Sequence, residues 1–252
     1  MTQPIWKSLG RPVALIYGLA TYLISLTTFL YTVGFVGNIF VPKSIDDGPK
    51  GSYGQSLFIN LGLFFLFALQ HSVMARKWFK GWWTRLVPRA VERSTYVLVS
   101  SLVLLFFFWQ WRPLTVVVWE VEYPPAQRIL EVLFWLGWLI AIHSSFLIDH
   151  GDLFGLRQVR LYTRGQAYTP VKFQMPDLYR YVRHPIMMGI LIAFWSTPVM
   201  TMGHFVFAAA STAYILLNIR HEEQELVELY GAAYREYRRR IPMLFPLPRR
   251  KD

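Results

Sequence analysis

The 252-residue chain contains no cysteine. Disulfide bonds, thiolate-bound zinc, iron–sulfur clusters and a cysteine nucleophile are therefore excluded, so any metal would need histidine and carboxylate ligands. Acidic residues are also scarce, because 15 Asp and Glu stand against 26 Lys and Arg and leave a net charge of +11. The basic residues lie in loops between apolar runs rather than on one polar face, which favours membrane lipid headgroups over nucleic acid as their partners.

Apolar sequence is abundant, with 54% hydrophobic and 17% aromatic residues. This composition predicts an all-α, polytopic membrane helix bundle that forms one domain over 1–252, with no separate soluble domain. A helix needs about 20 apolar residues to cross a membrane. Four runs meet this length and two shorter runs follow, at about 13–40, 55–75, 95–111, 129–148, 185–201 and 204–219. The last two are expected to form a short helical hairpin, because Pro198 interrupts one and Met202-Gly203-His204 joins them.

The first apolar run, Val13 to Val41, follows Lys7 and Arg11 in the manner of a signal peptide. It is too long for the apolar region of a signal peptide, and it shows no small-residue cleavage site. We therefore interpret it as a retained transmembrane helix.

Basic residues are distributed unevenly among the loops. The 75–94 loop carries six Lys and Arg against one acidic residue, and the 149–184 loop carries six against three. The 41–54 and 112–127 loops have no such excess. The positive-inside rule therefore predicts a multi-pass membrane protein whose N-terminus, C-terminus and 183–189 segment are cytoplasmic.

A polar cluster opens the first short run, in the sequence Arg-His-Pro-Ile-Met-Met-Gly at 183–189. Pro185 suits the first turn of a helix, where its missing N–H is not needed. The free N–H groups and positive dipole of that turn, together with Arg183 and His184, favour a carboxylate or phosphate ligand. The alternative is an arginine that reaches lipid headgroups and a histidine that caps the helix. Gly189 would let another backbone or a flat ligand approach closely.

Two carboxylates, Glu222 and Glu223, directly follow the last apolar run and its flanking basic residues. Carboxylates at a positive-inside membrane surface are unfavourable unless they are paired. They could hold a cationic or hydroxyl-rich ligand, or form salt bridges with Arg183, Arg180 or Arg220.

The tail at 222–240 has apolar residues at intervals of three or four, which predicts an amphipathic cytoplasmic helix closed by Pro242. Its tyrosines, Tyr230, Tyr234 and Tyr237, could stack on an aromatic base or contact a sulfonium by cation–π interaction. Tyrosines are also common at membrane interfaces without any ligand.

The 183–189 segment, the short hairpin, the paired glutamates and a Gly-x-x-Tyr-x-x-Tyr-x-x-x-Ile-Pro pattern at 231–242 occur together. This combination resembles the isoprenylcysteine carboxyl methyltransferase superfamily of integral-membrane enzymes. Four further segments lie at 41–46 (Val-Pro-Lys-Ser-Ile-Asp), 69–76 (Leu-Gln-His-Ser-Val-Met-Ala-Arg), 92–96 (Glu-Arg-Ser-Thr-Tyr) and 149–158 (Asp-His-x-Asp-Leu-Phe-Gly-Leu-Arg-Gln). With these, nearly the whole chain is similar to the bacterial methanethiol S-methyltransferases, which are related to NnrU-type membrane proteins.

The resemblance implies methyl transfer from S-adenosylmethionine to a small thiol, methanethiol, with hydrogen sulfide as a further acceptor. It places the cofactor-binding part at 177–245. The residues that it implies as cofactor contacts are Arg183, His184, Pro185, Gly189, Glu222, Glu223, Tyr234 and Tyr237. Many superfamily members have tyrosine where this chain has Met187, so a soft thioether replaces a hydrogen-bonding group there.

Thiol activation requires a base or a cation, because a small thiol is mostly protonated at neutral pH. The catalytic candidates are His71 with the adjacent Gln70, His143, and Arg183. Histidines inside membrane helices are also often simple hydrogen-bond partners between helices, and this stays open for His71.

A second polar cluster is expected from Asp149, His150 and Asp152 with Arg157. Three such groups at a loop entrance could bind a divalent metal, but histidine and carboxylate at this spacing are a weak ligand pattern. No metal is predicted.

Three other functions stay open. The methyl acceptor could be lipidic, such as isoprenylcysteine or a phospholipid. The chain could be a sterol-type membrane reductase that uses NADPH, with arginines of the 75–94 loop holding the adenosine phosphate. It could also be a non-catalytic NnrU-like membrane protein, although no internal repeat of the transporter kind is visible.

Overall fold

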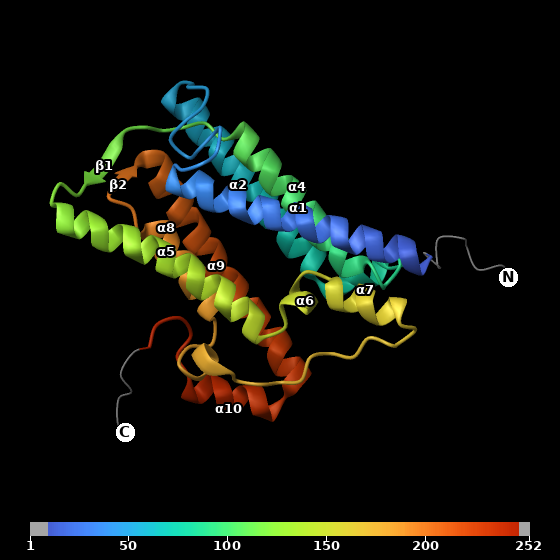
Figure 1. Ribbon diagram of the computed structural model, residues 1–252. Coiled ribbons are helices and arrows are strands. Elements are labelled where there is room, and N and C mark those ends of the chain that lie inside the picture. Colours follow the sequence, from blue (N-terminus) through green and yellow to red (C-terminus); the bar gives the residue numbers. More distant parts are fainter. Residues whose placement is uncertain (1–9, 247–252) are drawn as a thin grey trace. The chain divides into compact units, whose positions relative to one another are not determined.

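The computed structural model describes residues 10–246, in which ten α-helices are joined by loops and one short two-stranded sheet (Figure 1). Five of these helices are long and apolar enough to cross a membrane: α1 (Arg11–Gly37), α2 (Tyr53–Ala75), α4 (Glu92–Gln110), α5 (Pro124–Leu147) and α9 (Met202–Tyr230). The other elements are α3 (Lys77–Trp83), β1 (Val117–Glu120), α6 (His150–Leu153), α7 (Leu156–Thr163), the 3-10 helix η2 (Asp177–Arg180), α8 (Pro185–Trp195), β2 (Val199–Thr201) and α10 (Ala232–Arg240). The prediction of a multi-pass, all-α membrane protein is confirmed at this level.

The chain comprises two compact units. The first contains Met1–Leu114 and Asp149–Val171, and the second contains Thr115–Ile148 and Lys172–Asp252. His71 therefore belongs to the first unit, whereas the 183–189 segment and the paired glutamates belong to the second.

In the first unit, α1 packs against α4 and α7, and α2 packs against α4. Small polar side chains let α1 and α4 approach closely, as where Ser101 Oγ donates a hydrogen bond to Ser25 Oγ at 3.1 Å. The end of α4 is held by Asn60, which is fully buried in α2. Its side-chain amide bonds both the carbonyl of Arg112, at 2.7 Å, and the N–H of Arg112, at 2.9 Å.

In the second unit, α5 and α8 form the most extensive helix contact. Gly137 of α5 faces Gly189 of α8, and a Cβ atom added at Gly189 would lie 2.4 Å from the carbonyl oxygen of Gly137. The two backbones therefore touch, as is usual where glycines meet between membrane helices. Gly189 thus has the role of admitting another backbone.

A hairpin of two short helices was predicted, and the predicted length of its second helix is wrong. The first arm, α8, is short and ends at Trp195, three residues before Pro198. The second arm, α9, is 29 residues long and continues through Glu222 and Glu223 to Tyr230. The charged residues after Ile219 do not end the helix, because they are good helix formers and no glycine or proline interrupts them before Gly231.

The tip of this hairpin reaches the end of the unit where α5 begins. Strand β2, between α8 and α9, pairs antiparallel with β1, which lies directly before α5, with Val117 opposite Thr201. The 112–127 segment, expected to be only a loop, thus supplies one strand.

The prediction of a single amphipathic helix over 222–240 is also wrong. Gly231, with φ of +60°, separates α9 from α10, so the amphipathic segment is reduced to the nine residues of α10. This backbone conformation is open to glycine at little cost. The chain turns there, and α10 packs against α9.

Candidate active site

Arg183 lies directly before α8 and connects three parts of the second unit. Its Nε donates a hydrogen bond to Glu223 Oε1 at 2.7 Å, and both side chains are only 10% exposed. Its Nη1 donates to the carbonyl of Arg238, at 3.0 Å, and also to that of Ile241. A buried ion pair is tolerated when its remaining donors are satisfied, and these carbonyls do so. The salt bridge between Arg183 and Glu223, one of the alternatives that the sequence left open for these residues, is present in the structure.

His184 shares the same carboxylate. Its Nε2 lies 3.1 Å from Glu223 Oε1, and its Nδ1 lies 3.7 Å from Glu222 Oε2. The residue occupies the N-cap position of α8, but its side chain makes no capping hydrogen bond. His184 is therefore the N-cap residue, as the capping alternative expected, but its imidazole does not cap the helix. The imidazole is a bridge between the start of α8 and the paired glutamates.

Backbone hydrogen bonds fix the chain after α10 against the start of α8. The N–H of Arg183 donates to the carbonyl of Pro242 at 2.9 Å, and that of His184 to Met243 at 3.1 Å. Pro185 follows as the first residue of α8, as predicted. Three segments therefore meet at one place: the polar segment before α8, the end of α9 and the C-terminal segment. The predicted hairpin implied this meeting.

An aromatic cluster lies beside this ion pair. The ring of Phe173 contacts those of Tyr230, Tyr234 and Tyr237, with centroid separations of 5.2, 5.9 and 5.6 Å. Phe173 lies in a segment without regular secondary structure, and sequence analysis missed it. The sequence shows an aromatic residue in a loop segment there, but the absence of periodicity leaves the direction of its ring unpredictable.

The phenols of Tyr234 and Tyr237 stay protonated in the physiological pH range, because the pKa of each is raised. Burial raises the pKa of Tyr237 to about 12, although the nearby Arg183 lowers it in part. Burial and the adjacent Glu223 carboxylate also raise the pKa of Tyr234. The Tyr237 hydroxyl therefore acts as a donor, and it bonds the carbonyl of Tyr179 at 2.6 Å.

His143, the second histidine candidate, contacts Asp177 rather than the Arg183 group. Its Nε2 lies 2.8 Å from Asp177 Oδ2, and both side chains are more than half exposed. Tyr179, in the same 3-10 helix as Asp177, is buried and donates to the carbonyl of Ser144 at 3.4 Å. The pair therefore joins the end of α5 to the segment that supports Tyr237.

Met187 faces an apolar cluster of the same unit. It packs with Met188 and Met243 against buried side chains from α8, α9 and the C-terminal segment. Ile219, fully buried in this cluster, lies one helical turn before Glu223. The charged group thus borders directly on a water-poor, thioether-rich surface.

In the first unit, His71 is held by two side chains of α4. Its Nε2 lies 2.8 Å from the Tyr96 hydroxyl, and its Nδ1 lies 3.3 Å from Ser100 Oγ. Gln70 also bonds Ser100 Oγ, at 3.3 Å, whereas its buried Oε1 makes no hydrogen bond within the described chain. Phe67 stacks on the imidazole at 5.3 Å. Both ring nitrogens thus have a hydroxyl neighbour.

Two of the three side chains expected to gather around Arg157 do so in the first unit. Arg157 pairs with Asp149, at 3.4 Å, and with Asp152, at 3.1 Å. His150 instead bonds the Tyr22 hydroxyl at 3.1 Å. Between residues 10 and 246, no three histidine or carboxylate side chains are grouped so that they could hold a metal ion.

The fold and the site define a multi-pass helical membrane protein that gathers an Arg–His–Glu network and an aromatic cluster at one end of its last hairpin. No family model matches the chain, and no solved structure matches it. Curated proteins do. The methanethiol S-methyltransferase of Crocosphaera subtropica is 52% identical over 97% of this chain and 96% of that protein. That of Mycobacterium tuberculosis is 50% identical over 95% of this chain and 98% of that protein.

The chain belongs to the methanethiol S-methyltransferase family, as its motifs predicted. A more distant relative is the Nurim homolog of Drosophila pseudoobscura pseudoobscura, which is 28% identical over 81% of this chain and 92% of that protein.

Proposed function

We propose that this protein transfers the methyl group of S-adenosylmethionine to methanethiol and forms dimethyl sulfide. The observation that carries the proposal is the 52% identity to a methanethiol S-methyltransferase over nearly the full length of both chains. In the reaction a sulfur–carbon bond forms at the thiol, the sulfonium–methyl bond breaks, and the thiol proton is released. S-adenosylhomocysteine is the second product.

The residues of the second unit suit this cofactor. A sulfonium and an ammonium group favour carboxylates and aromatic faces. The second unit offers both, in Glu222, whose side chain is 49% exposed, and in the cluster of Phe173 with its tyrosines. When bound, S-adenosylmethionine supplies an electrophilic methyl group. We propose that Glu222, Tyr234 and Tyr237 belong to its binding surface.

This surface is proposed to be held in shape by three residues that support it without lining it: Arg183, His184 and Glu223. Their contacts are mainly with one another and with backbone carbonyls, so each fixes a neighbour. Arg183 and Glu223 are therefore positioning residues, and His184 holds the two carboxylates in place. Pro185 and Gly189 set the start and the depth of α8, the helix that carries the site; a direct contact of either with the cofactor stays a prediction.

The apolar surroundings favour the chemical step. A thiolate and a sulfonium neutralise each other in the transition state, so a water-poor pocket promotes their reaction. Met187 and the apolar cluster beside Glu223 would provide such a wall. Alignment of the two sulfurs with the methyl carbon supplies the rest of the rate enhancement.

The purified protein is expected to convert labelled S-adenosylmethionine and methanethiol to labelled dimethyl sulfide, and hydrogen sulfide to methanethiol. Volatile thioether in the headspace measures the reaction across a panel of thiols. Turnover of an isoprenylcysteine or phospholipid acceptor without any small thiol would overturn the proposal, as would NADPH-dependent sterol reduction. The absence of all these activities would favour a non-catalytic role.

We propose that the site faces the cytoplasm of the bacterial inner membrane, because the 75–94 and 149–184 loops carry the basic residues. The same assay tests this placement in sealed membrane vesicles. S-adenosylmethionine added outside should be consumed by inverted vesicles and not by right-side-out vesicles. The reverse result would overturn the orientation while leaving the reaction intact.

His71→Gln is expected to lower kcat by about 100- to 10,000-fold, because glutamine keeps a hydrogen-bonding side chain but cannot accept the thiol proton. We propose that His71 is the base and that Gln70 helps to hold the thiol. The measurement is the pH profile of kcat, together with the KM for S-adenosylmethionine, which should not change.

His143→Gln is the matched control, since His143 is the other histidine candidate and pairs with exposed Asp177. It should retain nearly full activity. Loss of activity in His143→Gln with retention in His71→Gln would transfer the role of base to His143.

A further inference from the structure

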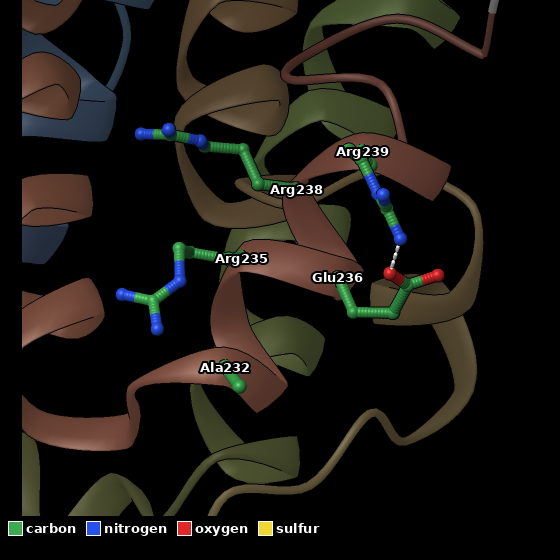
Figure 2. Close-up of a pocket in the computed structure, with 5 residues that line it drawn as sticks. All are labelled: Ala232, Arg235, Glu236, Arg238 and Arg239. Atoms are coloured by element: carbon green, nitrogen blue, oxygen red, sulfur yellow. Dashed lines mark hydrogen bonds and ion pairs between the residues drawn. The ribbon is translucent and has the colours of Figure 1, made fainter.

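The C-terminal helix α10 has two different faces. Tyr234 and Tyr237 are buried in the aromatic cluster described above. The other face is strongly basic and exposed, with four arginines in nine residues. A hollow of about 480 Å³ lies on this helix. It is lined by Ala232, Arg235, Glu236, Arg238 and Arg239, which are labelled in Figure 2. Nothing in the proposed methyl transfer uses this hollow.

The charges that line this hollow are not balanced by carboxylates of the described residues. The single carboxylate, Glu236, pairs with Arg239 and Arg240. Arg235 and Arg238 make no ion pair with any residue between 10 and 246, and they extend together to the side of α10 opposite that pair (Figure 2). Two neighbouring guanidinium groups repel each other unless an anion lies between them. The hollow therefore has the charge of an anion site.

Helix lengths place this anion site near the membrane boundary. The apolar part of α9, from Met202 to Ile219, is about 27 Å long, close to the thickness of the hydrocarbon core. The charged remainder extends about 16 Å beyond it. After Gly231 the chain returns, because the Arg238 carbonyl already accepts a hydrogen bond from Arg183, directly before α8. The arginine end of α10 thus lies at the depth where α8 enters the apolar layer.

We propose that the arginine hollow of α10 binds the phosphate group of an anionic phospholipid. Arginine's planar guanidinium matches phosphate oxygens with two parallel hydrogen bonds, and two such groups face the same side. The membrane surface supplies phosphates at this depth. This binding does not depend on the methyl acceptor or on the reaction proposed above.

Lipid binding would also act on the candidate active site. The carbonyls of Arg238 and Ile241, at the end of α10, hold the guanidinium of Arg183. A lipid that fixes α10 therefore also fixes the Arg183–Glu223 pair. Anionic lipid is expected to stabilise the protein and to raise its activity, whatever the acceptor.

The test compares the full chain in vesicles of phosphatidylcholine with the same vesicles containing phosphatidylglycerol. The wild type should gain about 4 °C in Tm in the presence of phosphatidylglycerol. The double variant Arg235→Gln/Arg238→Gln should lose most of this gain. Arg128→Gln, which removes an exposed arginine paired with Glu131 in the same unit, should keep it.

Two further measurements make each outcome decisive. Arg235→Lys/Arg238→Lys preserves charge and should retain a smaller gain, which separates loss of phosphate binding from damage to α10. Inorganic phosphate added to phosphatidylcholine vesicles should give no gain. An equal gain in Tm in the wild type and the glutamine variant would overturn the proposal. A full gain in Tm with inorganic phosphate would also overturn it, because the ligand of the hollow would then be a soluble anion.

Discussion

Glu223→Gln is expected to reduce methyl transfer by at least about 100-fold and to lower the free energy of unfolding by about 3 kcal/mol. The carboxylate neutralises the charge of Arg183, and both side chains of this pair are only 10% exposed. The same carboxylate also contacts the imidazole of His184. The amide of glutamine has the same shape but no charge, so the guanidinium stays buried without a counter-ion. Chemical denaturation measures the loss of stability, and the formation of dimethyl sulfide measures the loss of methyl transfer. Calorimetry of S-adenosylmethionine binding shows whether the cofactor site is affected.

Glu222→Gln is the matched control, because it removes the neighbouring carboxylate, whose side chain is 49% exposed. Exposed ion pairs contribute little to stability, so its unfolding free energy should change by less than about 1 kcal/mol. Its affinity for S-adenosylmethionine should still fall if Glu222 contacts the cofactor. Unchanged stability and unchanged cofactor affinity in Glu223→Gln would remove this carboxylate from the site.

The membrane spans could be predicted because uncharged length is a direct physical requirement of the bilayer. The run predicted at 55–75 became Tyr53–Ala75, and that at 129–148 became Pro124–Leu147. The same criterion failed for α9, because a helix does not end where its residues become polar. Its end is set by the positive φ of Gly231, and that turn is what brings α10 back to Arg183.

The candidate site could be predicted only in part. Arg183 and Glu223 carry opposite charges at the two ends of a hairpin, so their meeting followed from topology. The contact of Phe173 with the tyrosines did not, because a segment without periodicity has no predictable face. The partners of His71 lie one helical turn apart in α4, and such spacing could have indicated that Tyr96 and Ser100 share a face.

The contact between α5 and α8 controls a larger part of the second unit than the ion pair does. Gly189→Ala is expected to destabilise the protein by about 1–3 kcal/mol and to lower activity, because overpacking forces the backbone to move. The added Cβ would lie 2.4 Å from the Gly137 carbonyl oxygen and 2.7 Å from the backbone nitrogen of Ala141. Neither atom belongs to a flexible side chain that could move aside. The Tm and the specific activity in detergent are the measurements.

Gly62→Ala makes the same chemical change in α2, where an added Cβ meets no atom within 4 Å. It should leave the Tm unchanged or raise it slightly, since alanine is the better helix former. The Gly189→Ala defect should therefore come from the α5–α8 contact and not from the loss of a glycine as such. If Gly189→Ala instead keeps its Tm but weakens the binding of S-adenosylmethionine, Gly189 contacts the cofactor and the close backbone approach is secondary. If Gly189→Ala lowers both the Tm and the affinity for S-adenosylmethionine, the changed packing of α8 against α5 has displaced Arg183 and His184.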